Sequence, residues 1–240
     1  MVSQPAPKAR KSCRQTISRF WPLAGIQWTE LRAAYRVFLH NPAQGILHIL
    51  AAGRHSRWQA WVERRLARQA AALAGQTIAV DLDLLIQKPP HTLGGAYARH
   101  MRRYGFNPQT FRPGENPGET WLQQRMAISH DLYHVVTGFD ASPVGEFGVA
   151  AYTVVQYRDL LNGFVLSFVP LSLSNPQWTL PLLRALGRGF AMGLRGKPVI
   201  AYPLEYRWDV PLSMVREELG LGAFFHQDSP PLSPRRFPLP

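Results

Sequence analysis

Apolar residues through most of the chain recur every three or four positions, which is the spacing of an amphipathic α-helix. Residues 58–74 show this clearly, because tryptophan, valine, leucine and alanine share one side, arginines occupy the other, and Gly75 follows as a stop. Similar patterns predict helices at 58–74, from 93 to the stop at Gly105, and at 119–136, 143–161, 179–194 and 211–219. Strand-like alternation is scarce, and only residues 201–208 suggest a short strand.

This pattern predicts a mainly α fold with one domain. A chain of 240 residues with 46% hydrophobic residues is long enough and apolar enough to bury one sizeable core. Both ends are rich in proline, serine and arginine. We therefore expect disordered tails at residues 1–20 and 228–240 around a helical domain at 21–227.

The net charge of the chain limits the classes of partner that it can bind. A net charge of +12 favours a polyanion, either nucleic acid or anionic lipid, but no nucleic-acid recognition motif is present and we expect no such partner. No acidic residue precedes Glu30, so the basic N-terminal stretch is a solvated tail, a lipid-surface anchor or an organelle transit peptide. The single cysteine, Cys13, excludes a disulfide framework and fits a reducing compartment.

Membrane-spanning segments are not expected. The longest apolar run, residues 163–173, is shorter than the roughly 18 to 20 residues needed to cross a bilayer, and it contains Pro170. The N-terminus lacks the apolar segment of a secretory signal. The sequence therefore predicts a soluble or peripheral protein.

The strongest chemical signal is the sequence HDLYH at 130–134, followed after eleven intervening residues by Glu146. Side chains four apart share one face of a helix, so His130 and His134 point the same way, with Asp131 on a neighbouring strip. Residues 138–143 turn the chain, and the next helix presents Glu146 in its first turn. Two imidazoles and two carboxylates would thus converge between two central helices, which is a ligand set for zinc, or for iron or manganese.

A satisfied polar network is the alternative, because histidine pairs at this spacing are common and a glutamate at a helix start often serves the helix dipole. The surroundings favour a metal. Ala127, Ile128, Leu132, Val135 and Val136 make this helix substantially apolar. Four ionisable groups gathered against such a helix are costly to bury without a cation or full pairing.

These residues resemble the coenzyme Q biosynthesis protein 4 family. The matching segment is HDLYHVVTGFDASPVGE at 130–146, with the family's Thr-Gly turn and the Gly-Glu that ends it. Upstream, PPHTLGGAYARHMRRYGFNP resembles the family's Pro-x-(Thr/Ser)-Leu-Gly-x-x-Tyr segment, and Arg125 matches an arginine five residues before the motif. Residues 202–221 resemble its C-terminal stretch, so the resemblance covers about 88–221.

There are three departures. The family's second arginine, three residues before the motif, is Ala127 here, and its Lys-x-x-Glu after the Gly-Glu is replaced at Ala150 and Thr153. Because of these departures, the resemblance supports a metal site in this chain more strongly than it supports the family's activity.

The resemblance implies a mainly helical peripheral membrane protein that binds zinc or another divalent ion. The matching ligands, which are also the implied catalytic residues, are His130, Asp131, His134 and Glu146. It further implies oxidative decarboxylation at ring carbon C1 of a polyprenylated ubiquinone precursor, with other ubiquinone biosynthesis enzymes as partners and a possible homodimer. The expected location is the cytoplasmic face of a bacterial inner membrane, or the matrix side in a mitochondrion.

Further expectations concern the substrate. Hydroxylation after loss of CO2 needs oxygen and electrons, which zinc does not supply, so iron or another redox-active metal remains an alternative. Tyr97 and Tyr133 either hydrogen-bond ring oxygens or pack in the core, while His91 and His100 are expected at the surface. An apolar groove for the prenyl tail is expected at Leu160, Phe164, Leu166 and Phe168. Basic clusters at 8–19, at Arg64, Arg65 and Arg68, and at Arg99, Arg102 and Arg103 predict electrostatic binding to anionic lipid.

Two other functions compete with catalysis. The first is a non-catalytic scaffold that uses metal and lipid to organise other quinone enzymes, which the changes at Ala150 and Thr153 favour. The second is a phosphohydrolase, since His-Asp pairs also bind metals in such enzymes. Those enzymes usually draw further histidine and aspartate ligands from distant helices, and a second His-Asp pair is missing here.

Overall fold

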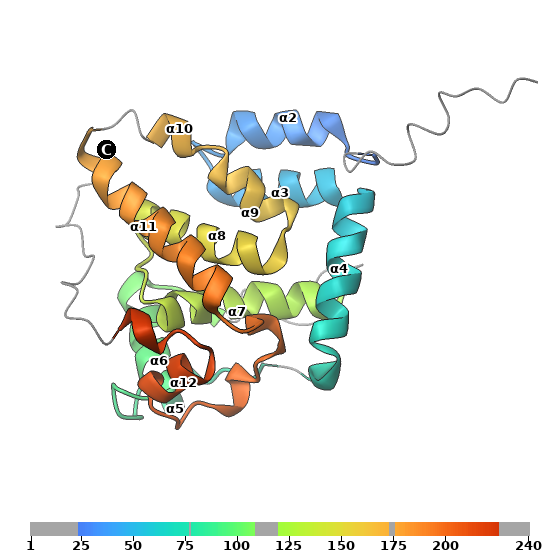
Figure 1. Cartoon of the computed structure of the whole chain (residues 1–240). Coiled ribbons are helices and arrows are strands. Elements are labelled where there is room, and N and C mark those ends of the chain that lie inside the picture. Colours follow the sequence, from blue (N-terminus) through green and yellow to red (C-terminus); the bar gives the residue numbers. More distant parts are fainter. Residues whose placement is uncertain (1–23, 77, 109–119, 173–175, 226–240) are drawn as a thin grey trace, which may run out of the picture. The chain divides into compact units, whose positions relative to one another are not determined.

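The computed structural model describes residues 24–76, 78–108, 120–172 and 176–225, and Figure 1 shows their helices in chain order. The predicted tails at 1–20 and 228–240 lie outside these residues. The backbone divides into two compact units, and the division falls between Trp61 and Val62, inside helix α4 (Arg57–Gln69). Each unit is described by itself.

The first unit holds two helices that the sequence analysis did not predict, α2 (Trp28–Val37) and α3 (Pro42–Gly53), which pack together. A signal for α3 was present, because Asn41 caps it by accepting a hydrogen bond from the Gln44 amide and Pro42 occupies its first turn. Helix α2 gives a weaker signal, since it buries only Ala34.

The second unit is built from the rest of α4 and the helices that follow. They are α5 (Leu82–Leu85), α6 (Leu93–Tyr104), α7 (Trp121–Thr137), α8 (Pro143–Tyr157), α9 (Leu160–Leu166), α10 (Val169–Ser172), α11 (Pro176–Arg195) and α12 (Leu212–Glu218). Helix α8 packs along α11 and also contacts α7 (Figure 1). Small residues allow this close packing, since a Cβ at Gly189 would lie 2.3 Å from the Gly148 carbonyl oxygen.

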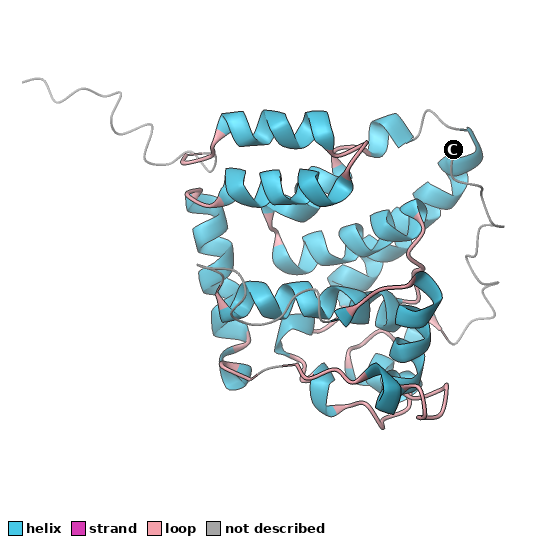
Figure 2. Ribbon diagram, turned by 180° about the vertical axis from the view of Figure 1, so that it is seen from behind, coloured by secondary structure: helices cyan, strands magenta, loops and turns pink. Residues whose placement is uncertain are grey.

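The predicted mainly α fold is confirmed. Figure 2 shows helices and loops but no strand among the described residues. The strand suggested at 201–208 is wrong, because this part forms the 3-10 turns Val199–Ala201 and Leu204–Tyr206. Pro203 cannot donate to a strand ladder, and the carbonyl oxygens of Ile200 and Tyr202 accept hydrogen bonds from Arg125 instead.

The helix predicted at 143–161 is shorter than expected. Helix α8 ends at Tyr157, where Arg158 adopts a positive φ of 57°, and α9 begins after Asp159. The sequence offers no glycine there, so the stop carried no local signal. A distant residue supports it, since Arg65 on α4 donates hydrogen bonds to the carbonyl oxygens of Gln156 and Tyr157.

Membrane crossing is not supported by the helices. Among the described residues, none of them is both long enough and apolar enough to span a bilayer.

Candidate metal centre

Helix α7 carries the two histidines and is fixed at both ends. At its start, Thr120 and Gln123 form a capping box, and at its end Gly138 adopts a positive φ of 75°. Arg216 donates hydrogen bonds to the carbonyl oxygens of Val135 and Val136 in its last turn. Because the termini are satisfied in this way, the face bearing His130 and His134 is held rigidly.

Helix α8 supplies the carboxylate. Ser142 caps its N-terminus by accepting a hydrogen bond from the Gly145 amide, and Pro143 and Glu146 lie in the first turn. Gly145 lies against the turn before α8, where a Cβ would lie 1.9 Å from the Asp140 carbonyl oxygen.

We expect Gly145→Ala to lower the free energy of unfolding by about 1 to 3 kcal/mol, because the turn must move to admit a methyl group. The same movement displaces Glu146 and weakens metal binding. Gly187→Ala is the matched control, because this glycine is also helical and a Cβ there would meet nothing within 4 Å. It should leave stability unchanged or raise it by about 0.5 to 1 kcal/mol. Chemical denaturation measures both, and equal stabilities would show that the turn yields without cost.

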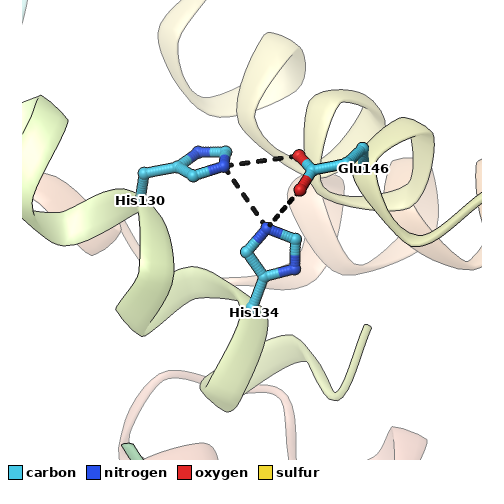
Figure 3. A group of neighbouring side chains, drawn as sticks. All are labelled: His130, His134 and Glu146. Carbon is cyan, nitrogen blue, oxygen red and sulfur yellow. Dashed lines mark hydrogen bonds and ion pairs between the residues drawn. The ribbon is translucent and has the colours of Figure 1, made fainter. Parts of the chain in front are cut away.

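Three of the four predicted ligands converge, and Asp131 is the one that does not. Figure 3 shows His130 and His134 from α7 facing Glu146 from α8. The Nε2 atoms of the histidines are 3.3 Å apart, His134 Nε2 lies 3.3 Å from Glu146 Oε1, and His130 Nε2 lies 3.4 Å from Glu146 Oε2. Ligand atoms around a tetrahedral ion with bonds of ~2.0 to 2.1 Å are separated by about 3.3 to 3.4 Å. The residues present therefore fit a zinc-sized divalent ion.

The tautomer of His134 also suits a metal. Its Nδ1 lies 3.2 Å from the Phe139 carbonyl oxygen and donates a hydrogen bond to it, which leaves Nε2 as the nitrogen free to bind. The His134 side chain is fully buried, whereas those of His130 and Glu146 are 46% and 42% exposed. The group thus has one buried side and one side that solvent or a substrate can reach.

The electrostatics of this group suit a cation. Burial would raise the pKa of Glu146, but hydrogen bonds and charge interactions with His130 and His134 outweigh it and hold that pKa well below its usual range. Burial lowers the pKa of His130, and this is outweighed by its hydrogen bond to Glu146 and by the charges of Glu146 and Asp131. Glu146 is therefore a carboxylate at neutral pH and ready to bind a metal.

Asp131 does not join the three converging groups. Burial raises the pKa of its carboxyl, the Glu146 charge adds to the shift, and His130 and His134 oppose it. Its charge also acts on Tyr97, whose pKa is raised first by burial and then by Asp131. The geometry is that of a charge beside the centre rather than within it.

The two tyrosines belong to the core. Tyr97 is fully buried, and its ring lies 5.5 Å from that of Trp208. Tyr133 is also buried, and its hydroxyl is hydrogen-bonded to that of Tyr157. Of the two alternatives that the sequence left open, core packing is the one that the structure supports.

His100 was placed wrongly. The sequence analysis expected it at the surface with His91, and only His91 is exposed. The His100 ring stacks on the His134 ring, with centroids 5.4 Å apart and planes 23° apart. Its pKa falls to about 4, because of burial first and then the nearby His134, His130 and Arg103, against the opposing charge of Glu146. Its spacing of three residues from Tyr97, which is buried, was the signal that could have shown His100 to be partly buried.

The three departures from the family pattern lie on the same two helices as the ligands. Ala127 on α7 is partly buried, while Ala150 and Thr153 on α8 are buried. The Thr153 hydroxyl donates to the Val149 carbonyl oxygen and is hydrogen-bonded to the Asn162 side chain. This position therefore ties α8 to α9.

Comparisons with known proteins agree with these features. Residues 64–224 match the family model of the coenzyme Q (ubiquinone) biosynthesis protein Coq4. The mitochondrial ubiquinone biosynthesis protein COQ4 of Coprinopsis cinerea is 26% identical over 145 residues, which are 59% of this chain and 50% of the relative. That of Lodderomyces elongisporus is 28% identical over 163 residues, which are 66% and 43% of the two chains. The chain thus spans about half the length of these curated relatives.

A solved structure is similar as well. The crystal structure of a candidate ubiquinone biosynthesis protein from Nostoc punctiforme superposes with a TM-score of 0.67 and 28% sequence identity. The match covers 82% of this chain and 99% of that one. Together with the match of residues 64–224, this likeness shows that the chain belongs to the coenzyme Q (ubiquinone) biosynthesis protein Coq4 family.

Proposed function

We propose that this protein acts in ubiquinone biosynthesis as a metal-dependent C1 oxidative decarboxylase of a polyprenylated 4-hydroxybenzoate-type precursor. The observation that carries the proposal is the triangle of His130, His134 and Glu146, with separations of 3.3 to 3.4 Å, in a member of this family. Zinc fits this triangle, and iron or another redox-active divalent ion would use the same ligands.

Each residue has a role in this proposal. His130, His134 and Glu146 hold the ion, and the Phe139 carbonyl fixes the orientation of the His134 ring. Asp131 adds negative charge beside the centre, where it interacts with the charges of both histidines. A divalent ion held here supplies a Lewis acid for the carboxylate or phenolate of the precursor ring. The exposed edge formed by His130 and Glu146 gives that ring access.

The overall reaction requires an oxidant. The bond between C1 and its carboxyl group breaks, CO2 leaves, and a new bond joins C1 to one oxygen atom of dioxygen. The other oxygen atom leaves as water, which takes two electrons and two protons from a reductant. This requirement favours a redox-active ion in the working protein, since zinc cannot pass electrons.

The direct test uses purified full-length protein, a precursor with a short prenyl chain, dioxygen and a chemical reductant. Protein loaded with iron, cobalt or zinc is compared with Glu146→Gln, and mass spectrometry follows CO2 and the hydroxylated ring. We expect product that depends on the metal and on Glu146. Tight metal binding without product from any loaded form would contradict the catalytic proposal.

A second function has its own support. The side chains at Ala150 and Thr153 differ from the family pattern and are buried in the fold, so the two charged groups that the pattern places after Glu146 are missing. A non-catalytic protein that binds metal and lipid and organises other ubiquinone biosynthesis enzymes needs only the metal centre and a lipid-binding surface. Restoring the family residues with Ala150→Lys/Thr153→Glu separates the two functions. If the double variant turns over the precursor and the wild type does not, this chain has lost the activity and the non-catalytic function is supported.

We further propose that the protein works at a membrane surface. Helix α11 carries an exposed apolar stripe at helical spacing, made of Leu180, Leu183, Phe190 and Leu194. Two arginines of the predicted basic clusters have partners within the protein. Arg65 is bound to α8 carbonyl oxygens, and Arg102 pairs with Asp83. Apolar insertion would therefore support the electrostatic attraction.

Co-sedimentation with anionic liposomes tests this surface. We expect binding to fall as salt rises, and Leu183→Ser/Leu194→Ser to weaken it at least tenfold, because each leucine contributes about 1.5 to 3 kcal/mol when it leaves water. Leu84→Ser is the control, since Leu84 is equally exposed but lies on α5. Equal binding by all three proteins would exclude α11 as the lipid-binding surface.

We propose that the prenyl tail of the precursor binds along α9 and the residues that follow it. Of the expected groove residues, Phe164 and Phe168 are buried and pack edge to face with centroids 5.1 Å apart, while Leu160 and Leu166 are half-buried. A tail that enters there must separate the two phenylalanines or slide along the leucines. A prenylated phenol that raises the unfolding temperature of the wild type but not of Phe164→Ala would support this site.

A further inference from the structure

His100 is a polar residue in a place that packing alone does not explain. It lies on α6 and stacks on His134 from a third helix, separate from the two that carry the proposed ligands. Its ring also lies 5.0 Å from the ring of Tyr104 and 6.2 Å from that of Phe106. A phenylalanine would make the same ring contacts. The ring contacts therefore do not explain why this position carries two ring nitrogens.

One of those nitrogens has no partner. The Nε2 atom of His100 is buried and forms no hydrogen bond. A buried polar atom without a partner destabilises the fold, and most such atoms in proteins are satisfied by a group, a water or an ion. The ring that carries this atom stacks on the ring of His134, which is one of the three proposed metal ligands. The metal centre is therefore the nearest place for its missing partner.

The geometry argues against direct ligation. The donor atoms of His130, His134 and Glu146 all lie within 4.8 Å of one another, and His100 is not part of that group. A nitrogen that adjoins the centre beside the buried His134, without entering this group, is suited to contact the inner end of a ligand that occupies the ion. Carboxylate and phenolate oxygens are the groups that histidine nitrogens hydrogen-bond and that divalent ions attract.

We propose that His100 binds, through Nε2, the carboxylate or phenolate oxygen of the ligand that occupies the metal centre. This rests on the metal site of the proposed function. His100 is then a residue that positions an aromatic acid, supplied by a helix outside the ligand pair, and it distinguishes oxygen-bearing ring substrates from purely apolar ones.

The test uses full-length protein loaded with cobalt, whose visible spectrum reports both ion binding and ligand binding, and 4-hydroxybenzoate as the probe. His100→Phe keeps the ring cluster and removes the nitrogen, and His100→Gln returns a polar group. His91→Phe is the control, since His91 is exposed just before α6. Circular dichroism verifies that each variant is folded.

We expect all four proteins to bind cobalt with similar affinity. The probe should bind about tenfold more weakly to His100→Phe, in line with one lost hydrogen bond to a charged group, and the glutamine variant should recover part of that loss. Wild-type affinity for the probe in His100→Phe would overturn the proposal and leave His100 as packing. A loss of cobalt binding in folded His100→Phe would also overturn it, because His100 would then be a direct ligand.

Two further outcomes distinguish failure of the His100 proposal from failure of the metal centre. If the wild type binds cobalt but not the probe, the His100 proposal is wrong while the metal centre stands. If the wild type binds no cobalt, the metal centre itself is wrong, and the proposal for His100 is overturned with it.

Discussion

Glu146→Gln is expected to abolish the stabilisation that zinc gives to the folded protein. At a zinc concentration 100 times the Kd, binding adds about 2.7 kcal/mol to the wild type, which corresponds to a rise of roughly 5 to 10 °C in Tm. The glutamine keeps the shape of the side chain but removes the charge that lies between His130 and His134. Differential scanning fluorimetry with and without zinc measures the shift.

Two further variants test whether the loss of the zinc shift is specific to the proposed ligands. His134→Ala removes the buried ligand and should also lose the shift, while His91→Ala, which removes an exposed histidine, should keep it. An unchanged zinc shift in Glu146→Gln and His134→Ala would mean that zinc acts elsewhere on the protein.

Glu205→Ala is expected to destabilise the fold by about 3 to 5 kcal/mol, or roughly 6 to 20 °C in Tm. Arg125 Nη1 donates to Glu205 Oε1 at 2.7 Å, and both side chains are only 2% exposed. Removing the carboxylate leaves the Arg125 charge buried without its partner. Because Arg125 joins α7 to the turns at 199–206, the loss should also reduce metal affinity.

The matched comparison separates burial from charge. The exposed pair of Arg102 and Asp83 lies at 2.8 Å, so Asp83→Asn should cost less than about 1 kcal/mol. Arg125→Met/Glu205→Leu should recover much of the lost stability, because it replaces the buried pair with apolar groups. A Glu205→Ala protein as stable as the wild type would show that water reaches Arg125.

The centre could be predicted largely because its determinants are local. The spacing of His130 and His134 needs only helical geometry, and Ser142-Pro143 marks the start of the helix that presents Glu146. The same holds for the stops at Gly105 and Gly138, where a positive φ is required.

The parts that could not be predicted depend on contacts between distant residues. His100 reaches His134 only because α6 packs against α7, and no spacing within α6 reveals that neighbour. The end of α8 at Tyr157 depends on Arg65, 92 positions earlier in the chain. The turns at 199–206 likewise depend on Arg125, which takes the carbonyl oxygens that a strand would have used.

X-ray absorption spectroscopy at the metal edge tests the centre most directly, with purified protein carrying one equivalent of zinc. The account predicts two histidine nitrogens and a carboxylate oxygen at ~2.0 to 2.2 Å, and the loss of the histidine contributions in His134→Ala, which should no longer hold the ion. A sulfur ligand at ~2.3 Å, or a spectrum that His134→Ala leaves unchanged, would contradict the assignment of His130, His134 and Glu146 as the metal ligands.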